Sequence, residues 1–159
     1  LTVGTYDGAN IEIREAVGED NFFLFGLREN EIQEMRPTYN PRKIYEESEY
    51  IKRILNAINS NLFCEKDSPS LFKPIFDELL NRDYFFVLAD LEAFNNAMKE
   101  AEKAYLKQDE WAKKAIYNVA KVGYFSSDRA VAEYADKIWH VKSVDSDDAF
   151  EPEQEAKSA

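Results

Sequence analysis

Cysteine, histidine and long apolar runs are scarce in this sequence, and each scarcity excludes a class of protein. The single cysteine, Cys64, cannot form an internal disulfide, which fits a reducing compartment such as the cytoplasm. The single histidine, His140, leaves no His/Cys group with zinc-binding spacing. No apolar run approaches the roughly 20 residues that span a bilayer. An initiator Met and a signal segment are missing too, so we expect the 159 residues to be a piece of a longer chain.

Negative charge is in excess. There are 31 Asp and Glu against 20 Lys and Arg, a formal net charge of −11, which argues against nucleic acid or an anionic membrane as the main partner. Residues 143–159 hold six carboxylates and one Lys, so we expect a folded part at 1–142 and an acidic, disordered tail at 143–159. With 45% hydrophobic and 14% aromatic residues, the chain has ample material for a core.

The first 26 residues have the pattern of a strand–helix–strand unit. A short β-branched segment at 1–5 runs into an Asp-Gly-Ala-Asn turn, and Ile11 begins a short helix that Gly18 ends. The continuous apolar run at 21–26 is typical of a strand buried on both faces, as in a parallel sheet. The sequence therefore predicts an α/β fold with short parallel strands.

The remainder is predominantly helical in pattern. Apolar residues recur at helical spacing after position 27, with one further apolar run that predicts a strand at 84–88. The predicted helices cover 28–35, 42–60, 71–80, 91–105 with Asp90 as N-cap, a segment from Asp109 that Gly123 stops, and a last helix from Ser126 to Trp139 with Val131, Ala135 and Ile138 facing inward.

Few residues are candidates for chemistry. Asp7 and Asn10 follow a predicted parallel strand, where ligands of open α/β sheets bind, so they are candidates for the floor of a cleft. The alternative is that Asp7 only caps the helix while Gly8 permits the turn. His140 at a helix end and Cys64 beside large apolar residues are better interpreted as structural and inert. No catalytic, cofactor-binding or metal-ligating residue is predicted.

The aromatic residues of the apolar runs are expected to pack in the core and not to form a stacking platform, because no basic residues alternate with them. They are Phe22, Phe23, Phe25, Phe85 and Phe86.

Two long blocks of sequence closely resemble the C-terminal part of the glycogen (α-1,4-glucan) phosphorylases. The first covers 1–13 and 18–26, and the second runs from Gly123 to Trp139; Asp83-Tyr84-Phe85, Ala89-Asp90 and Trp111-Ala112-Lys113-Lys114 recur between them in the same order. The resemblance extends over residues 1–140 and is weaker at 30–80.

The resemblance implies a parent enzyme with the two-domain GT-B fold, in which this chain is the C-terminal portion of the cofactor-side Rossmann-like domain. Such an enzyme, a homodimer holding pyridoxal phosphate, uses inorganic phosphate to release terminal glucose from an α-1,4-glucan as glucose 1-phosphate. In the family the Schiff-base lysine lies upstream of the segment matching Leu1, so no catalytic or cofactor role passes to a residue of this chain.

Two hypotheses follow. In the first, the chain is the C-terminal part of an α-glucan phosphorylase, inactive alone, whose partner is the remainder of that enzyme. In the second, it is an independent acidic interaction module that keeps a remnant of the fold. Because two or three strands leave sheet edges and apolar faces uncovered, we expect the isolated chain to associate or to fold only partly.

Overall fold

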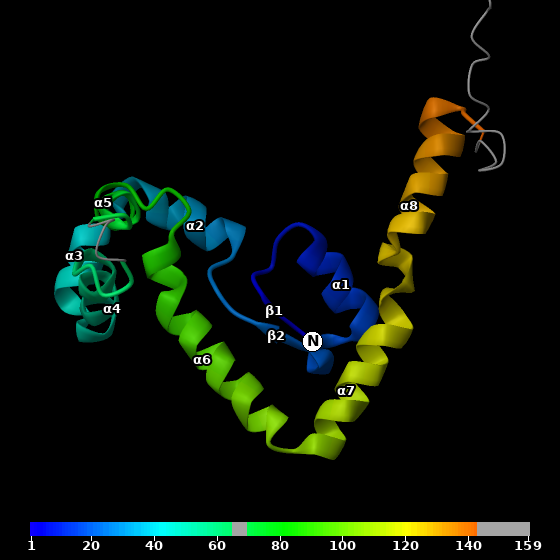
Figure 1. Cartoon of the computed structure of the whole chain (residues 1–159), viewed down its shortest axis with the longest axis horizontal. Helices are drawn as coiled ribbons and strands as arrows, with labels where there is room; N and C mark the ends of the chain where they lie inside the picture. The colour runs from blue at the N-terminus through cyan, green and yellow to red at the C-terminus, as the bar shows by residue number, and fades with distance from the viewer. Residues whose placement is uncertain (65–69, 143–159) are drawn as a thin grey trace, which may run out of the picture. The chain divides into compact units, whose positions relative to one another are not determined.

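A computed structural model of the chain describes residues 1–64 and 70–142 and divides it into two compact units, Leu1–Lys121 and Val122–Ala159 (Figure 1). The expected disordered tail at 143–159 lies outside the described residues, and the assignment of 1–142 to one portion of a Rossmann-like domain stays a prediction.

The elements of the first unit are β1 (Thr2–Gly4), α1 (Ala9–Val17), β2 (Phe22–Leu24), α2 (Glu29–Met35), α3 (Pro41–Glu47), α4 (Glu49–Asn59), α5 (Lys73–Asn81), α6 (Val87–Tyr105) and α7 (Gln108–Lys121), with short 3-10 helices at Glu19–Asn21 and Arg36–Thr38. The second unit has a 3-10 helix at Val122–Phe125, α8 (Ser127–Tyr134) and a turn of π-helix at Ala135–Trp139.

The strand–helix–strand prediction is confirmed. β1 and β2 are parallel neighbours, with Thr2 opposite Phe22, and α1 forms the crossover between them. Gly18 ends α1 with φ at +85°, a conformation that disfavours a side chain, and its N–H bonds to the carbonyl of Arg14. The chain is thus α/β, mostly helical, with a two-stranded parallel sheet.

Two long helices flank the β1–α1–β2 segment. α6 contacts both strands, and the rings of Phe25 and Phe94 meet edge to face at 5.2 Å, while α7 packs on α1 (Figure 1). Phe22 is buried as predicted. The parallel strands therefore sit between helices that come much later in the sequence.

The main apolar core lies where α3, α4 and α5 pack together beside the start of α6. Ile51, Leu55 and Leu88 are each 1% exposed, and partly buried apolar residues surround them. The predicted single helix at 42–60 is divided at Ser48, whose backbone is extended with φ at −108° and whose hydroxyl accepts a hydrogen bond from the N–H of Ile51. Ser48 ends α3 and caps α4, which lets two short helices wrap this core.

The predicted strand at 84–88 is wrong. Asp83 and Phe86 have positive φ values of 37° and 59°, which produce a tight turn, and α6 begins at Val87. The Asp83 carboxylate accepts hydrogen bonds of 2.8 Å from the N–H groups of both Val87 and Leu88, so it caps the new helix. Phe86 is buried as expected, but Phe85 is 79% exposed, so its expected core position is also wrong.

The second unit is a short helical segment with an exposed apolar face. Val131 and Ile138, predicted to face inward, are each 59% exposed, because no other helix of this unit covers them among its described residues. Across residues 1–64 and 70–142, none of the helices has the length and apolarity needed to cross a membrane.

Candidate functional site

The candidate site is the edge of the sheet where both strands end. Because β1 and β2 are parallel, the loops that follow them leave from the same edge. The structure places Asp7 in the first of these loops, with an exposed side chain that accepts a 3.0 Å hydrogen bond from the hydroxyl of Thr5. The residue at the N-cap of α1 is Gly8, and α1 has no side-chain cap, so the Asp7 carboxylate does not serve as one. The carboxylate is therefore held at the strand end and open to solvent.

Asn10 lies at the same edge and fastens the first turn of α1 to β1. A Cβ atom on Gly4 would come within 2.7 Å of the Asn10 side-chain nitrogen, so the two residues are in close contact only because position 4 is glycine. The N–H of Asn10 also donates to the carbonyl of Asp7, at 3.1 Å. Asp7 and Asn10 are thus brought together, as their spacing predicts.

A surface pocket of about 580 Å³, the strand-end pocket, opens beside these residues. Its lining is Tyr6, Asp7, Gly8, Ile11, Leu27, Glu29, Ile32, Gln33 and Arg36. No lysine belongs to this described lining, so the pocket has no amine that could form an imine with an aldehyde cofactor such as pyridoxal phosphate. None of the described lining residues could therefore anchor such a cofactor covalently.

Two arginines flank the ring of Tyr6, a feature that the sequence does not signal. The guanidinium of Arg28 lies 4.3 Å from the ring centroid and that of Arg14 lies 5.8 Å away, both within the range of cation–π attraction. Arg14 also pairs with Glu19 at 2.9 Å. Tyr6 and Arg28 both follow a strand within four residues, which is too general a pattern to predict their contact.

Asp90 belongs to the site, although the sequence predicts it as the cap of its own helix. It lies in the first turn of α6, and its carboxylate accepts a 2.8 Å hydrogen bond from the N–H of Leu27, 63 residues earlier. Burial raises the pKa of the Asp90 carboxyl, the Leu27 N–H opposes that rise, and the charges of Asp83 and Glu31 add to it. Asp90 therefore ties α6 to the loop after β2.

The remaining candidates have structural positions. His140 ends the last helical turn with φ at +53°, and its Nδ1 lies 2.7 Å from the carbonyl oxygen of Asp136, so it lies at a helix end as predicted. Cys64 is a free thiol of intermediate exposure, so it is less buried than its apolar neighbours in the sequence suggest. In the described ranges, no three His, Cys, Asp or Glu side chains gather where they could hold a metal ion.

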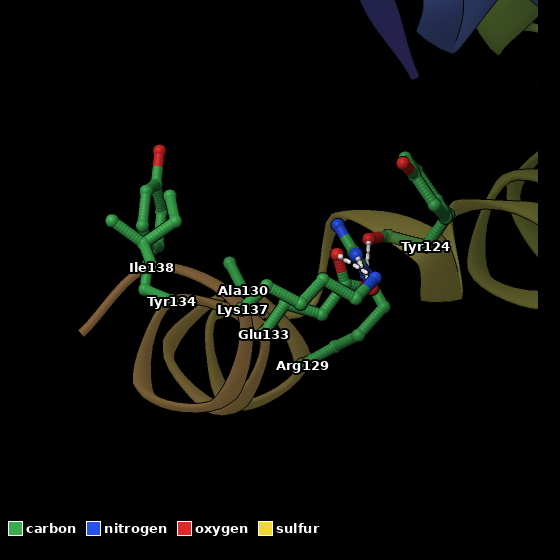
Figure 2. A pocket seen from close by; sticks show the side chains of 7 residues that line it. All are labelled: Tyr124, Arg129, Ala130, Glu133, Tyr134, Lys137 and Ile138. Atoms are coloured by element: carbon green, nitrogen blue, oxygen red, sulfur yellow. Dashed lines mark hydrogen bonds and ion pairs between the residues drawn. The ribbon is translucent and has the colours of Figure 1, made fainter. Parts of the chain in front are cut away.

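The second unit has a pocket of its own, of about 320 Å³, along α8. Figure 2 shows three charged side chains between Tyr124 on one side and Tyr134 with Ile138 on the other. Glu133 pairs with Arg129 and, at 3.3 Å, with Lys137; the hydrogen bonds from these two residues lower the pKa of its carboxyl. All three charges lie four residues apart on one helix face, the spacing of a stabilising ion-pair ladder.

Comparisons with known proteins agree with the resemblance seen in the sequence. A family model described as carbohydrate phosphorylase matches residues 1–141. The chain is 49% identical over 142 residues to a glycogen phosphorylase of Chlamydia trachomatis, covering 89% of this chain and 17% of that protein. It is 46% identical over 145 residues to a glycogen phosphorylase of Synechocystis sp., and this match covers 91% of this chain and 17% of that protein. It is 41% identical over 146 residues to the brain form of glycogen phosphorylase from Homo sapiens, and this match covers 91% of this chain and 17% of that protein. The chain thus spans about 17% of the length of the curated relatives it matches.

Proposed function

The chain belongs to the carbohydrate phosphorylase family, and from that premise we propose that it forms the C-terminal part of an α-1,4-glucan phosphorylase. That enzyme uses inorganic phosphate to release terminal glucose from a glucan as glucose 1-phosphate. The observation that carries the proposal is the family match over residues 1–141, together with relatives named glycogen phosphorylase of which the chain covers only 17%. An independent interaction module is less well supported, because nearly the whole described chain matches the family.

Within the enzyme, the strand-end pocket is proposed to be the part of the chain that faces the cleft, with Asp7 and Asn10 on its floor. The exposed carboxylate of Asp7 and the convergence of both strand-end loops support this assignment. The two-stranded parallel sheet is proposed to complete the sheet of a Rossmann-like domain in a GT-B fold. Its uncovered edges suit that role, since parallel strands are normally flanked by further strands and by helices.

The cofactor of the parent is proposed to be pyridoxal phosphate, whose phosphate group supplies proton transfer to the substrate phosphate when it is bound. The described lining of the strand-end pocket has no lysine, so the attachment falls to a lysine elsewhere in the enzyme. The chain alone is accordingly proposed to be inactive. The parent is proposed to be a cytoplasmic homodimer, which the single free cysteine suits.

A chimera tests this function. Residues 1–142 replace the matching segment of the Chlamydia trachomatis glycogen phosphorylase, and glucose 1-phosphate is measured with maltodextrin and phosphate as substrates. We expect phosphorolysis from the chimera and none from the 159-residue chain supplied with pyridoxal phosphate. The same relative with the segment deleted is the matched control.

Each part of the proposal has a result that overturns it. A folded chimera that takes up the cofactor yet releases no glucose 1-phosphate contradicts the assigned role. Phosphorolysis by the 159-residue chain alone contradicts its inactivity.

A further inference from the structure

A continuous set of contacts joins α6 to Asp7. One carboxylate oxygen of Asp90 accepts the hydrogen bond from the N–H of Leu27, at 2.8 Å. The other oxygen lies against Gly26: a Cβ atom on Gly26 would be 2.8 Å from it and 2.9 Å from the methyl carbon of Thr5. The Asp90 carboxylate and the Thr5 methyl group therefore both occupy the space that a side chain at position 26 would take, and both lie against Gly26.

Thr5 passes this constraint to Asp7. Its hydroxyl donates to the Asp7 carboxylate at 3.0 Å. The methyl and hydroxyl groups of threonine share one Cβ atom, and a β-branched side chain has few χ1 rotamers. Holding the methyl group against Gly26 therefore fixes the direction in which the hydroxyl points, and with it the position of the carboxylate that accepts its hydrogen bond.

Asp90 is not needed to start its own helix. Asp83 already caps α6 through the N–H groups of Val87 and Leu88, each at 2.8 Å. The bond from Asp90 to Leu27 is charge-assisted and reaches across 63 residues to the loop that lines the strand-end pocket. The hydrogen bond that Asp90 accepts from that loop thus explains the position of the Asp90 side chain.

We propose that Asp90 is a positioning residue for Asp7, acting through Gly26 and Thr5 to set the floor of the strand-end pocket. This inference rests on the proposed function, in which Asp7 faces the cleft of the enzyme. It assigns a role in the reaction to a residue on α6 that does not line the pocket itself.

The test uses the active chimera and measures kcat/KM for phosphorolysis per folded enzyme. Asp90→Ala removes the acceptor and is expected to lower kcat/KM about tenfold, whereas Asp90→Asn keeps an oxygen toward Leu27 and is expected to stay within about threefold of the parent. Asp77→Ala, which breaks an exposed ion pair with Lys73, is the matched control and is expected to change nothing.

A double-mutant cycle separates positioning from general stability. Thr5→Val keeps a methyl group against Gly26 but removes the hydroxyl that reaches Asp7. If Asp90 acts through Thr5, then Asp90→Ala lowers kcat/KM by a much smaller factor in the Thr5→Val background than in the parent chimera. Strictly additive losses, or Asp90→Ala activity equal to that of Asp77→Ala, overturn the inference.

Hydrogen exchange on the same chimera provides a measurement that does not need activity. Asp90→Ala is expected to speed exchange in peptides covering 26–28 and 7–11, while the centre of α6 stays protected. If amide hydrogen exchange becomes faster only in 26–28, the proposed coupling of Asp90 to Asp7 is wrong. An unmutated chimera that is folded but inactive contradicts the proposed function instead, and the exchange comparison still decides the coupling.

Discussion

The hydroxyl of Tyr39 donates a hydrogen bond to the carboxylate of Asp83, which is 2% exposed and caps α6. The ring of Tyr39 lies against that of Phe86, with centroids 4.3 Å apart, and Arg36 lies 4.9 Å from the Phe86 ring. The buried carboxylate thus has three donors, one hydroxyl and two helix N–H groups. This arrangement holds the start of α6 against the segment before α3.

Tyr39→Phe is expected to reveal an alkaline step in stability. Burial raises the pKa of the Tyr39 hydroxyl above its ordinary value of 10.0, and the hydrogen bond to Asp83 raises it further. A raised pKa in the folded state means that the stabilisation is complete below pH 10 and is lost as the pH rises above it. Urea unfolding of the chimera that carries residues 1–142 should show the Tyr39→Phe variant about 1–3 kcal/mol less stable than the parent chimera at pH 8, with the difference in unfolding free energy narrowing above pH 10.

The matched control for this prediction is Tyr117→Phe, since Tyr117 is 55% exposed. Its stability should follow that of the parent chain at every pH. The coupling between the hydroxyl proton and folding would be contradicted if the unfolding free energies of Tyr39→Phe and the parent differed by the same amount from pH 8 to pH 11.

Local signals in the sequence were enough for the first part of the fold. The apolar run at 21–26 and the glycine at position 18 both act within a few residues, and β1, α1 and β2 form as predicted. The apolar run at 84–88 fits a strand equally well by its pattern, and the turn at 83–86 is seen only in the structure, where the Asp83 carboxylate accepts hydrogen bonds from Val87 and Leu88 and from Tyr39, 44 residues away. Asp7 and Asn10 are placed at the strand end by the sequence because they follow the first strand closely, and their role in a cleft stays a prediction.

The contact between Asp90 and Leu27 cannot be predicted from sequence patterns for the same reason. Leu27 lies 63 residues away from Asp90, and a local rule places an aspartate at a helix start as a cap. The predicted inward face of α8 is also wrong, since an apolar stripe predicts burial without showing what covers it.

Gly26→Ala is expected to destabilise the chain by about 1–3 kcal/mol. Gly26 has φ at +83°, and a Cβ atom there would meet Asp90 and Thr5 at 2.8 and 2.9 Å. Gly123→Ala is the matched control, because a Cβ atom on Gly123 would meet no described atom within 4 Å and the φ of Gly123 is not positive. Urea unfolding of the two variants gives the comparison, and equal stabilities would contradict the close contact at Gly26.

The isolated 159-residue chain is expected to self-associate or to fold only in part. Ile116 and Val119 on α7 are 67% and 79% exposed, and such apolar faces favour association. The double variant Ile116→Glu, Val119→Glu should raise the monomeric fraction in sedimentation velocity. Ala112→Glu with Ala120→Glu adds the same charge to exposed positions of α7 and should have a smaller effect. A monomeric parent chain with a sharp thermal transition would contradict the expectation.

Asp7→Asn in the active chimera is expected to lower kcat/KM about tenfold while changing the unfolding free energy by no more than about 0.5 kcal/mol. The carboxylate is exposed, and its side chain bonds to Thr5, a contact that an amide oxygen can keep. Removing its charge therefore costs the fold little but weakens the hydrogen-bond acceptor that the proposed cleft would offer to a sugar hydroxyl.

The matched control for that variant is Asp109→Asn, an exposed aspartate in the first turn of α7, away from the strand ends. It carries the same change in net charge, so a general effect of charge on the enzyme would appear in both variants. If Asp7→Asn and Asp109→Asn have equal kcat/KM values, Asp7 does not face the cleft. If Asp7→Asn alone loses activity at unchanged stability, its charge acts on the substrates, because folding and net charge are matched between the two.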